Sequence, residues 1–419
     1  MNEHHFSRRA FLKSASVAAL STPFAGSPFT NIVFAAPKRP QSCIVIGAGM
    51  SGLAAASRLQ QNGWAVTIVE ARPRIGGRIL THRFADSNLH CELGGEWIAE
   101  DHKRMMALCR HFALPLQEHR FQNTLPQNGE VSFEAKNAWK KFAAAWPKYT
   151  TRDKQNLDFY DWRTWLKRIG YSEDDLRLCD LSDRKIFGES IHHVSAYVAA
   201  MQYLESNSSG EMNWKIIGGN DCLPRLMAEK IGISSFRLAT IVSAITQKNG
   251  KVFVRAGNET LMADACICTV PARVLNSIRF DPALPGEQIK AAWQLQYARV
   301  VKSAAKGVLV SHAVGEKADL LAAQSSARRQ NIIAADLARF DGCAPKLASG
   351  IVSHAWQSDP WAQGAHALYR PGQWFSLRPI LQKPHGKILF AGEHLADRQA
   401  SMEGAVVTGE AAADALLGK

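Results

Sequence analysis

The arrangement of apolar and polar positions after residue 40 predicts a strand, a helix and a second strand. Residues 42–47 form a continuous apolar, largely β-branched run, which is typical of a strand buried on both faces of a parallel sheet. Residues 53–61 show helical patterning that Gly63 closes, and 65–69 form the next strand-like run. Together they predict a βαβ unit, with Glu70 at the end of its second strand.

The pattern changes twice further along the chain. Residues 101–209 have helical periodicity and are rich in aromatic side chains, which we interpret as the core of an inserted helical region without a catalytic role. Short alternating segments return from 236 to 270, with a hairpin turn at 247–251 and a buried strand at 263–270. The aromatic residues of the helical region are Trp139, Trp146, Tyr160, Trp162 and Trp165.

Length and charge restrict the class of protein. A chain of 419 residues with 46% hydrophobic content can bury a large core, which predicts a soluble globular protein with two or three lobes. Its formal net charge is +13, but the Lys and Arg residues are scattered and lack the aromatic interleaving of a nucleic-acid groove. We therefore expect no nucleic-acid partner.

The first 37 residues resemble a twin-arginine export signal. Ser7-Arg8-Arg9-Ala10-Phe11-Leu12-Lys13 precedes a modestly apolar run from Ala15 to Phe24 and small residues at Ala35-Ala36. That run is too short to span a bilayer, and no later segment reaches about 18 uninterrupted apolar residues. The expectation is a periplasmic protein, carried in folded form by the twin-arginine export machinery, with no stable membrane span.

Eight dispersed cysteines show no pair of CxxC elements. Cys266 and Cys268 share one face of a strand-like run, but no nearby histidines complete a metal site. We predict no metal site and interpret the thiols as small buried apolar groups, leaving one or two disulfides open.

A glycine motif marks a dinucleotide site. Gly47-x-Gly49-x-x-Gly52 follows a predicted strand and opens a predicted helix. The glycines permit a tight turn and close approach of the backbone to a pyrophosphate. Glu70 follows at the distance from which a carboxylate accepts hydrogen bonds from ribose hydroxyls.

Three further motifs decide which dinucleotide is bound. Arg74-Ile75-Gly76-Gly77-Arg78, Glu92-Leu93-Gly94-Gly95-Glu96-Trp97 and Gly392-Glu393 resemble the flavin-dependent amine oxidase family. The resemblance runs from Cys43 to the C-terminus and is weak between about 100 and 210. It implies an α/β fold, with a Rossmann-type FAD-binding domain, a mixed-sheet substrate domain and a helical insertion. The FAD-binding domain would comprise 38–100, 211–275 and 376–419, the helical region 101–210, and a shortened substrate domain 276–375.

The resemblance also implies the residues that hold FAD. One group matches positions around the ADP part, a second runs beside the flavin ring, and a third completes the site from the C-terminal half. Thr269-Val270-Pro271 resembles the strand end that closes over the cofactor, and Val242 a backbone contact to adenine. The groups are Ser51, Gly52, Glu70, Arg72, Gly77 and Arg78; Gly94, Gly95, Glu96, Trp97 and Trp356; and Gly392, Glu393 and Met402.

Lys302 is the candidate catalytic residue. Relatives commonly use a lysine to hold a water near flavin N5, and Tyr297-Ala298-Arg299-Val300-Val301-Lys302 resembles that segment. Lys306 would share its face if the segment is an extended strand, so it remains an alternative.

The chain departs from the family around the substrate. His366 and Ser401 stand where monoamine oxidases place two aromatic cage residues, so the cage is absent or rebuilt, with Trp361, Tyr369 or Trp374 as candidates. Ala365 lies near the position of covalent flavin attachment in some relatives and has no sulfur, which implies noncovalent FAD. Only 53 residues separate Lys302 from Trp356, so the substrate domain looks trimmed.

The implied activity is oxidation of an amine to an imine, and then to an aldehyde or ketone. Electrons would pass to O2, giving hydrogen peroxide, or to a periplasmic acceptor. An L-amino-acid oxidase is an alternative, although Ile98 stands where such relatives often carry a carboxylate-binding arginine; Arg104 or Arg120 could substitute. A lipid or isoprenoid desaturase or isomerase and a non-catalytic flavoprotein partner also remain open.

Overall fold

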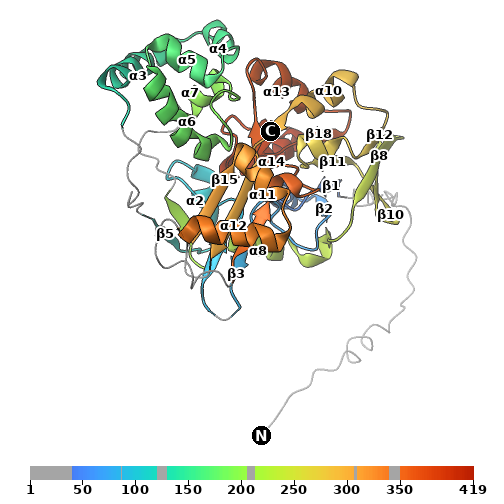
Figure 1. The fold of residues 1–419 in the computed structure, drawn as a ribbon. Coiled ribbons are helices and arrows are strands. Elements are labelled where there is room, and N and C mark those ends of the chain that lie inside the picture. Colours follow the sequence, from blue (N-terminus) through green and yellow to red (C-terminus); the bar gives the residue numbers. More distant parts are fainter. Residues whose placement is uncertain (1–39, 86, 120–129, 205–212, 306–308, 339–349) are drawn as a thin grey trace, which may run out of the picture. The chain divides into compact units, whose positions relative to one another are not determined.

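The computed structural model describes residues 40–85, 87–119, 130–204, 213–305, 309–338 and 350–419 (Figure 1). The twin-arginine segment, Arg120, Lys306 and Cys343 lie outside these residues. A five-stranded, all-parallel sheet in the order β18-β11-β1-β2-β7 carries the glycine motif. Its strands are β1 (Ser42–Ile46), β2 (Ala65–Val69), β7 (Phe236–Arg237), β11 (Ala265–Cys268) and β18 (Ile388–Phe390).

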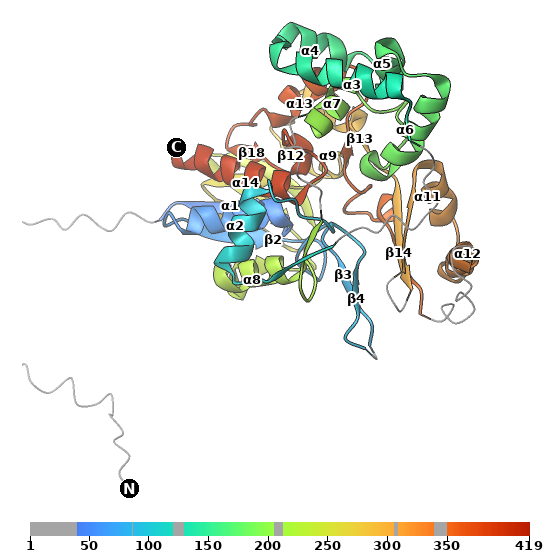
Figure 2. The same ribbon diagram turned by 90° about the vertical axis from the view of Figure 1, so that its left-hand side faces the viewer.

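The predicted βαβ unit is confirmed, with a longer helix than expected. Helix α1 (Met50–Gln60) begins three residues before the predicted start because the extended backbone of Gly49 leads directly into it. Helix α14 (Met402–Leu417) lies beside α1, and both pack on the parallel sheet (Figure 2). The two helices approach so closely that a Cβ on Gly409 would lie 2.1 Å from the Ser51 carbonyl oxygen.

A second, four-stranded sheet in the order β10-β9-β8-β12 is mixed. The predicted hairpin turn is confirmed, with Asn249 and Gly250 both at positive φ between β8 and β9. The predicted continuous strand 263–270 is wrong at both ends, because Ala263 belongs to β10 and β11 ends at Cys268. Between the two strands, the Asp264 carboxylate accepts hydrogen bonds from the Ser42 amide and hydroxyl, at 2.9 and 2.8 Å. The strands are β8 (Val242–Lys248), β9 (Lys251–Ala256), β10 (Glu259–Ala263) and β12 (Arg279–Asp281).

A three-stranded antiparallel sheet in the order β15-β14-β16 carries the candidate lysine. Val301 packs on one face of it with Ala318 and Leu321 of helix α11, whereas Ala304 packs on the other face with Phe84. Lys302 shares the face of Ala304 because successive side chains of a strand alternate. The elements are β14 (Val300–Ala305), β15 (Leu309–Val314), β16 (Val352–Ala355), α11 (Gly315–Ala322) and α12 (Ser326–Ala338).

Three two-stranded ribbons and four further helices complete this part of the described residues. The ribbons are β3 (Thr81–Arg83) with β4 (His90–Glu92), β5 (Leu116–Glu118) with β6 (Trp214–Ile216), and β13 (Gln296–Tyr297) with β17 (Ala367–Leu368). The longer helices beside them are α8 (Cys222–Ile231), α10 (Gly286–Gln294) and α13 (Trp374–Gln382); α9 (Ala272–Leu275) is a single turn.

The helical region is confirmed, and its aromatic residues form a core. Trp162 is 2% exposed, and its indole nitrogen donates to the buried Asp183 carboxylate at 3.1 Å. Trp139 packs edge-to-face on Trp162, and Phe142 on Trp146. Helices α3 (Phe133–Ala145), α4 (Thr151–Asp158), α5 (Trp162–Ile169), α6 (Glu173–Phe187) and α7 (Ala196–Leu204) gather together in Figure 2. Helix α2 (Lys103–His111) lies apart from them, against α14.

The cysteines of the described residues are unpaired. Cys43, Cys266 and Cys268 are buried in the parallel sheet, and burial raises the pKa of Cys43 and of Cys268 to about 12. Cys179 and Cys222 are only half-buried, so the interpretation of all thiols as buried groups is wrong for these two. No helix within the described ranges is both long and apolar enough to cross a membrane.

The crossing of α1 and α14 gives the first prediction. Gly409→Ala should lower the free energy of unfolding by about 3 kcal/mol, because a methyl group there would overlap backbone rather than a flexible side chain. Urea unfolding measures this difference. Gly286→Ala is the control, since a Cβ at Gly286 meets nothing within 4 Å, and it should change stability by less than about 0.5 kcal/mol. Equal effects of the two substitutions would contradict the close helix contact.

Candidate FAD and substrate site

The glycine loop is shaped by contacts that exclude side chains at two positions and leave room at a third. A Cβ at Gly47, whose φ is +104°, would lie 2.5 Å from Thr269 Oγ1, and one at Gly52 would lie 1.9 Å from the Gly47 carbonyl oxygen. At Gly49 the nearest atom would be Gly77 Cα, at 3.9 Å. A Cβ at Gly49 would therefore meet only an ordinary van der Waals contact within the protein, which leaves room for the predicted approach of a pyrophosphate.

Two polar features at the start of α1 fit a phosphate group. The Ser51 hydroxyl oxygen is buried and has no hydrogen-bond partner within the described protein. The first amides of α1 have no side-chain cap. A buried hydroxyl and a set of unpaired helix amides are suited to accept an anion, so these residues fit the pyrophosphate of FAD.

Glu70 is held in position by the backbone around it. Its carboxylate accepts hydrogen bonds from the Ala48 amide at 2.8 Å and the Arg72 amide at 2.9 Å. A carboxylate has about four acceptor sites, so two remain for ribose hydroxyls. Arg72 forms an ion pair with Asp359 at 2.5 Å, which links this edge of the site to the segment after Trp356.

Arg78 and Glu393 join the two remote halves of the site. The guanidinium donates to Glu393 at 2.7 Å and to the Ala365 carbonyl at 3.1 Å. Glu393 also accepts from the amides of Ala367 and Ala400, each at 3.0 Å. Burial alone would raise the pKa of Glu393, but the charge of Arg78 holds it below its usual value. Sequence prediction placed both residues at the cofactor, and the structure brings them together.

The segment predicted to run beside the flavin ring is fixed from both chain halves. A Cβ at Gly94 would lie 2.1 Å from the Arg78 carbonyl oxygen, and one at Gly95 would lie 3.3 Å from the Met402 side chain. Trp356 is 2% exposed and donates from its indole nitrogen to the Leu93 carbonyl at 2.7 Å. The start of α14 and the end of β16 therefore border the same short segment.

Two other predicted cofactor residues occupy strand and turn positions. Val242 begins β8 and is 8% exposed, and its contact to adenine remains a prediction. Gly392 has a φ of +148°, and its amide donates to Thr408 Oγ1 of α14 at 3.1 Å. Thr269 follows the end of β11 and donates to the Ile46 carbonyl at 2.8 Å.

Lys302 projects into a buried charged cluster. Its ammonium donates to the Gly94 carbonyl at 3.1 Å and forms an ion pair with Glu96. Glu96 forms a second ion pair with Lys215 of β6, whose ammonium lies 3.9 Å from the centre of the Trp97 ring. The three charged side chains are 7%, 9% and 22% exposed for Lys302, Glu96 and Lys215 respectively.

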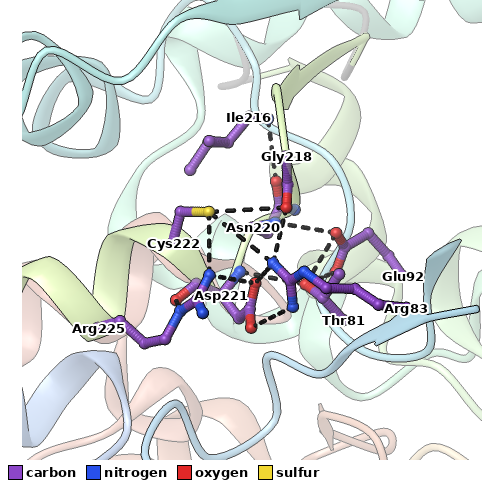
Figure 3. A network of polar contacts seen from close by, with 9 residues as sticks. All are labelled: Thr81, Arg83, Glu92, Ile216, Gly218, Asn220, Asp221, Cys222 and Arg225. Carbon is purple, nitrogen blue, oxygen red and sulfur yellow. Dashed lines mark hydrogen bonds and ion pairs between the residues drawn. The ribbon is translucent and has the colours of Figure 1, made fainter. Parts of the chain in front are cut away.

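Asn220 holds this cluster and was missed by the sequence analysis. Its side-chain amide donates to the carbonyls of Gly95 at 3.0 Å and Glu96 at 2.7 Å, while its oxygen accepts from the Ile216 amide at 3.1 Å. Its own amide donates to Glu92, within the polar network of Figure 3. The Gly218-Gly219-Asn220 turn after a short strand was the available signal, because both glycines adopt positive φ.

Two proposed substitutes for the aromatic cage belong to the core. Tyr369 is fully buried and donates to the His394 carbonyl at 2.6 Å, and Trp374 packs against it at a ring distance of 5.1 Å. Both join the large hydrophobic cluster, so they are not free to form a cage. Trp361 is the remaining candidate and is half-buried.

The proposed replacement for a carboxylate-binding arginine is also engaged elsewhere. Arg104 forms an ion pair with Glu410 of α14 at 2.5 Å, and nearly half of its side chain is exposed. Ile98 is fully buried in the core beside the parallel sheet. Arg104 is therefore a surface residue that joins α2 to α14.

Two histidines near the cluster have lowered pKa values. Desolvation lowers the pKa of His366, one of the cage departures, and its ring lies close to Gly188 of the helical region. His312 lies opposite Lys302 on β15. Part of its side chain is exposed to solvent, but protein atoms surround it closely. Desolvation, and to a smaller extent the charge of Lys302, lower its pKa to about 4. Both imidazoles are therefore neutral at pH 7.

Substitution at Gly49 separates cofactor binding from folding. Gly49→Val should fold with a stability within about 1 kcal/mol of the unmodified protein, because space exists beside Gly49, yet it should retain no flavin. Absorbance between 350 and 550 nm measures bound flavin, and circular dichroism measures folding. A yellow Gly49→Val protein would contradict the assignment of this space to the pyrophosphate.

Asp359 should make stability depend on pH. Burial would raise its pKa, but the His354 ring nitrogen at 3.4 Å and the charge of Arg72 hold it at about 2, below the unfolded value of about 3.9. A carboxyl whose pKa is lower in the folded state stabilises the fold at pH values above its unfolded-state pKa. This contribution is lost as the pH falls towards 2. Between pH 5 and pH 3 the unmodified protein should lose about 1 kcal/mol more unfolding free energy than Asp359→Asn. Parallel urea titrations would test this, and equal losses would refute it.

Comparison with known proteins agrees with this geometry. Residues 50–306 and 302–417 match the family model for flavin containing amine oxidoreductase. The L-amino acid dehydrogenase of Synechocystis sp. is 22% identical over 91% of this chain and 96% of its own length. The nicotine dehydrogenase of Pseudomonas putida is 24% identical over 96% of this chain and 95% of its own length. The structure of cyclohexylamine oxidase from Brevibacterium oxydans superposes with a TM-score of 0.76 at 23% identity, covering 90% of this chain and 99% of that one. The predicted α/β fold is thereby confirmed, and the chain belongs to the flavin-containing amine oxidoreductase family.

Proposed function

We propose that this chain uses noncovalently bound FAD to oxidise the C–N bond of an amine to an imine, which water hydrolyses to an aldehyde or ketone. When bound, FAD supplies the two-electron acceptor for this oxidation. The observation that carries the proposal is the buried Lys302 ammonium, hydrogen-bonded to the Gly94 carbonyl in the segment predicted to run beside the flavin. Similarity to a cyclohexylamine oxidase and to a nicotine dehydrogenase supports an amine substrate.

The residues of the chain would bind and orient rather than act as strong bases. Glu70, Ser51 and the start of α1 would hold the ribose and pyrophosphate, while the 94–97 segment and Trp356 would border the ring. An ammonium group has three N–H donors, and Lys302 uses two of them for Gly94 and Glu96. The third would hold a water at the reacting face.

The flavin would be reoxidised by O2, giving hydrogen peroxide, or by a periplasmic electron acceptor. The periplasmic location rests on the twin-arginine pattern at Arg8-Arg9. Noncovalent binding rests on Ala365, whose methyl side chain offers no atom for attachment and whose carbonyl accepts from Arg78.

Oxidation of an L-amino acid is a second candidate. It is favoured by the excess of ammonium groups over carboxylates in the trio of Lys302, Glu96 and Lys215, because an excess of positive charge suits a substrate carboxylate. Similarity to the L-amino acid dehydrogenase of Synechocystis sp. also supports it. Amino acids compared with their decarboxylated amines would separate the two candidates.

An anaerobic titration tests the proposed function. The purified protein should be yellow, and its flavin band should bleach with one class among primary amines, polyamines and L-amino acids. A yellow protein that none of these compounds reduces would contradict amine oxidation. A colourless protein would contradict the cofactor itself.

Lys302→Met tests the role of the lysine. We expect FAD to be retained, because Glu96 keeps Lys215 as a partner, and flavin reduction or reoxidation to slow by about 10²-fold. Stopped-flow absorbance measures the two half-reactions separately. The control is Lys383→Met, which removes a surface lysine paired with Glu287 at 2.9 Å. Unchanged rates of both half-reactions in Lys302→Met would remove this lysine from the mechanism.

A further inference from the structure

Two lysines from different parts of the chain share one buried carboxylate. We propose that Lys215 is a positioning residue which acts on Lys302 through Glu96, and that the balance of these three charges sets how readily bound FAD is reduced. This inference rests on the proposed binding of FAD, but it concerns Lys215, which no sequence motif identified.

The three side chains come from separate elements that meet only in the folded protein. Lys302 lies on β14, Glu96 in the segment after β4, and Lys215 on β6. Glu96 uses one carboxylate oxygen for each lysine, Oε2 for Lys302 and Oε1 for Lys215. Loss of either lysine would therefore leave one oxygen of the carboxylate without its charged partner.

The position of Lys215 is fixed on two sides. Its ammonium lies over the Trp97 ring, in a cation–π contact of 3.9 Å to the ring centre. Asn220 links the Ile216 amide, next along β6, to the Gly95 and Glu96 carbonyls. Lys215 is thus coupled to the same short segment that carries the carboxylate it shares.

Four titratable groups, three histidines and Glu92, lie near the trio of two lysines and Glu96. Desolvation lowers the pKa values of His312 and of His119, which packs on Trp97, so both are neutral at pH 7. His354 lies opposite Lys302 on β16 and faces Asp359 at 3.4 Å. Glu92 accepts hydrogen bonds from Thr81 and Asn220, burial raises its pKa, and it is left in place in every variant considered below.

The trio consequently carries one net positive charge in a region shielded from water. Two-electron reduction adds negative charge to a flavin unless it takes up two protons. A nearby positive charge favours that change, and its effect is strong where solvent screening is weak. Removing Lys215 should make reduction harder, whereas neutralising Glu96 should make it easier.

Midpoint potentials of the flavin in the holoenzyme test the direction of each predicted effect. Each protein is reduced chemically, with dithionite and a reference redox dye, so that no amine substrate is needed. Lys215→Met should shift the dye equilibrium about tenfold towards oxidised flavin, and Glu96→Gln about tenfold towards reduced flavin. The double variant, which has the original net charge, should return close to the unmodified protein. Lys215→Arg should also stay close to it, and Lys383→Met controls for removal of a lysine from a surface ion pair.

Opposite shifts with recovery in the double variant support the proposal. Shifts of the same sign in Lys215→Met and Glu96→Gln, or no shift in either, overturn it. If Lys215→Met binds FAD weakly, the ratio of its affinities for oxidised and reduced FAD replaces the potential; an equal loss of both affinities indicates a purely structural role and overturns the proposal. Opposite shifts in a protein that no amine reduces would support the role of Lys215 while contradicting the proposed function.

Discussion

The ion pair between Arg78 and Glu393 is the constraint on which the rest of the site depends. It joins a loop near the start of the fold to the turn after β18, and the carboxylate is further held by the Ala367 and Ala400 amides. Because Glu393 is buried, removal of Arg78 would leave an uncompensated carboxylate, which costs far more than the loss of a surface ion pair. The pair therefore specifies one arrangement of three chain segments around the cofactor.

Around this pair, the positions of the remaining groups follow from close backbone packing. Gly94 lies against the Arg78 carbonyl, Gly95 against Met402, and Gly409 against Ser51, so α14 contacts both the 94–97 segment and α1 at glycines. The β14 sheet then presents Lys302 to the same segment, while α11 covers its other face. The polar groups of the candidate site therefore come from separate elements, each of which is also held by its own packing contacts.

The sequence was sufficient to predict the parallel sheet and the helical region, because each has a local pattern, and a family motif led to Lys302, which the structure places beside Gly94. The contacts of the family motifs with FAD and the role of Lys302 stay predictions. The sequence was insufficient for Lys215, Asn220 and Asp359, since their importance lies in partners distant in the sequence. Tyr369 and Trp374, two of the three candidates for a rebuilt cage, belong to the core instead, because aromatic residues of core and cage look alike until burial is known. The strand predicted over 263–270 is limited to Ala265–Cys268, and Asp264 just before it binds Ser42 through its carboxylate as well as through its backbone amide.

The wide separation of Arg78 and Glu393 along the chain has a consequence for biosynthesis. During synthesis the glycine loop and Glu70 emerge early, but the carboxylate that closes the site and the first turn of α14 emerge only after most of the chain has been made. Domains fold as units when their segments become available, so the cofactor has no complete binding site on the nascent chain. The two halves of the predicted flavin site therefore meet only late in synthesis, and a protein truncated before Glu393 would keep the dinucleotide motif while lacking the carboxylate that pairs with Arg78.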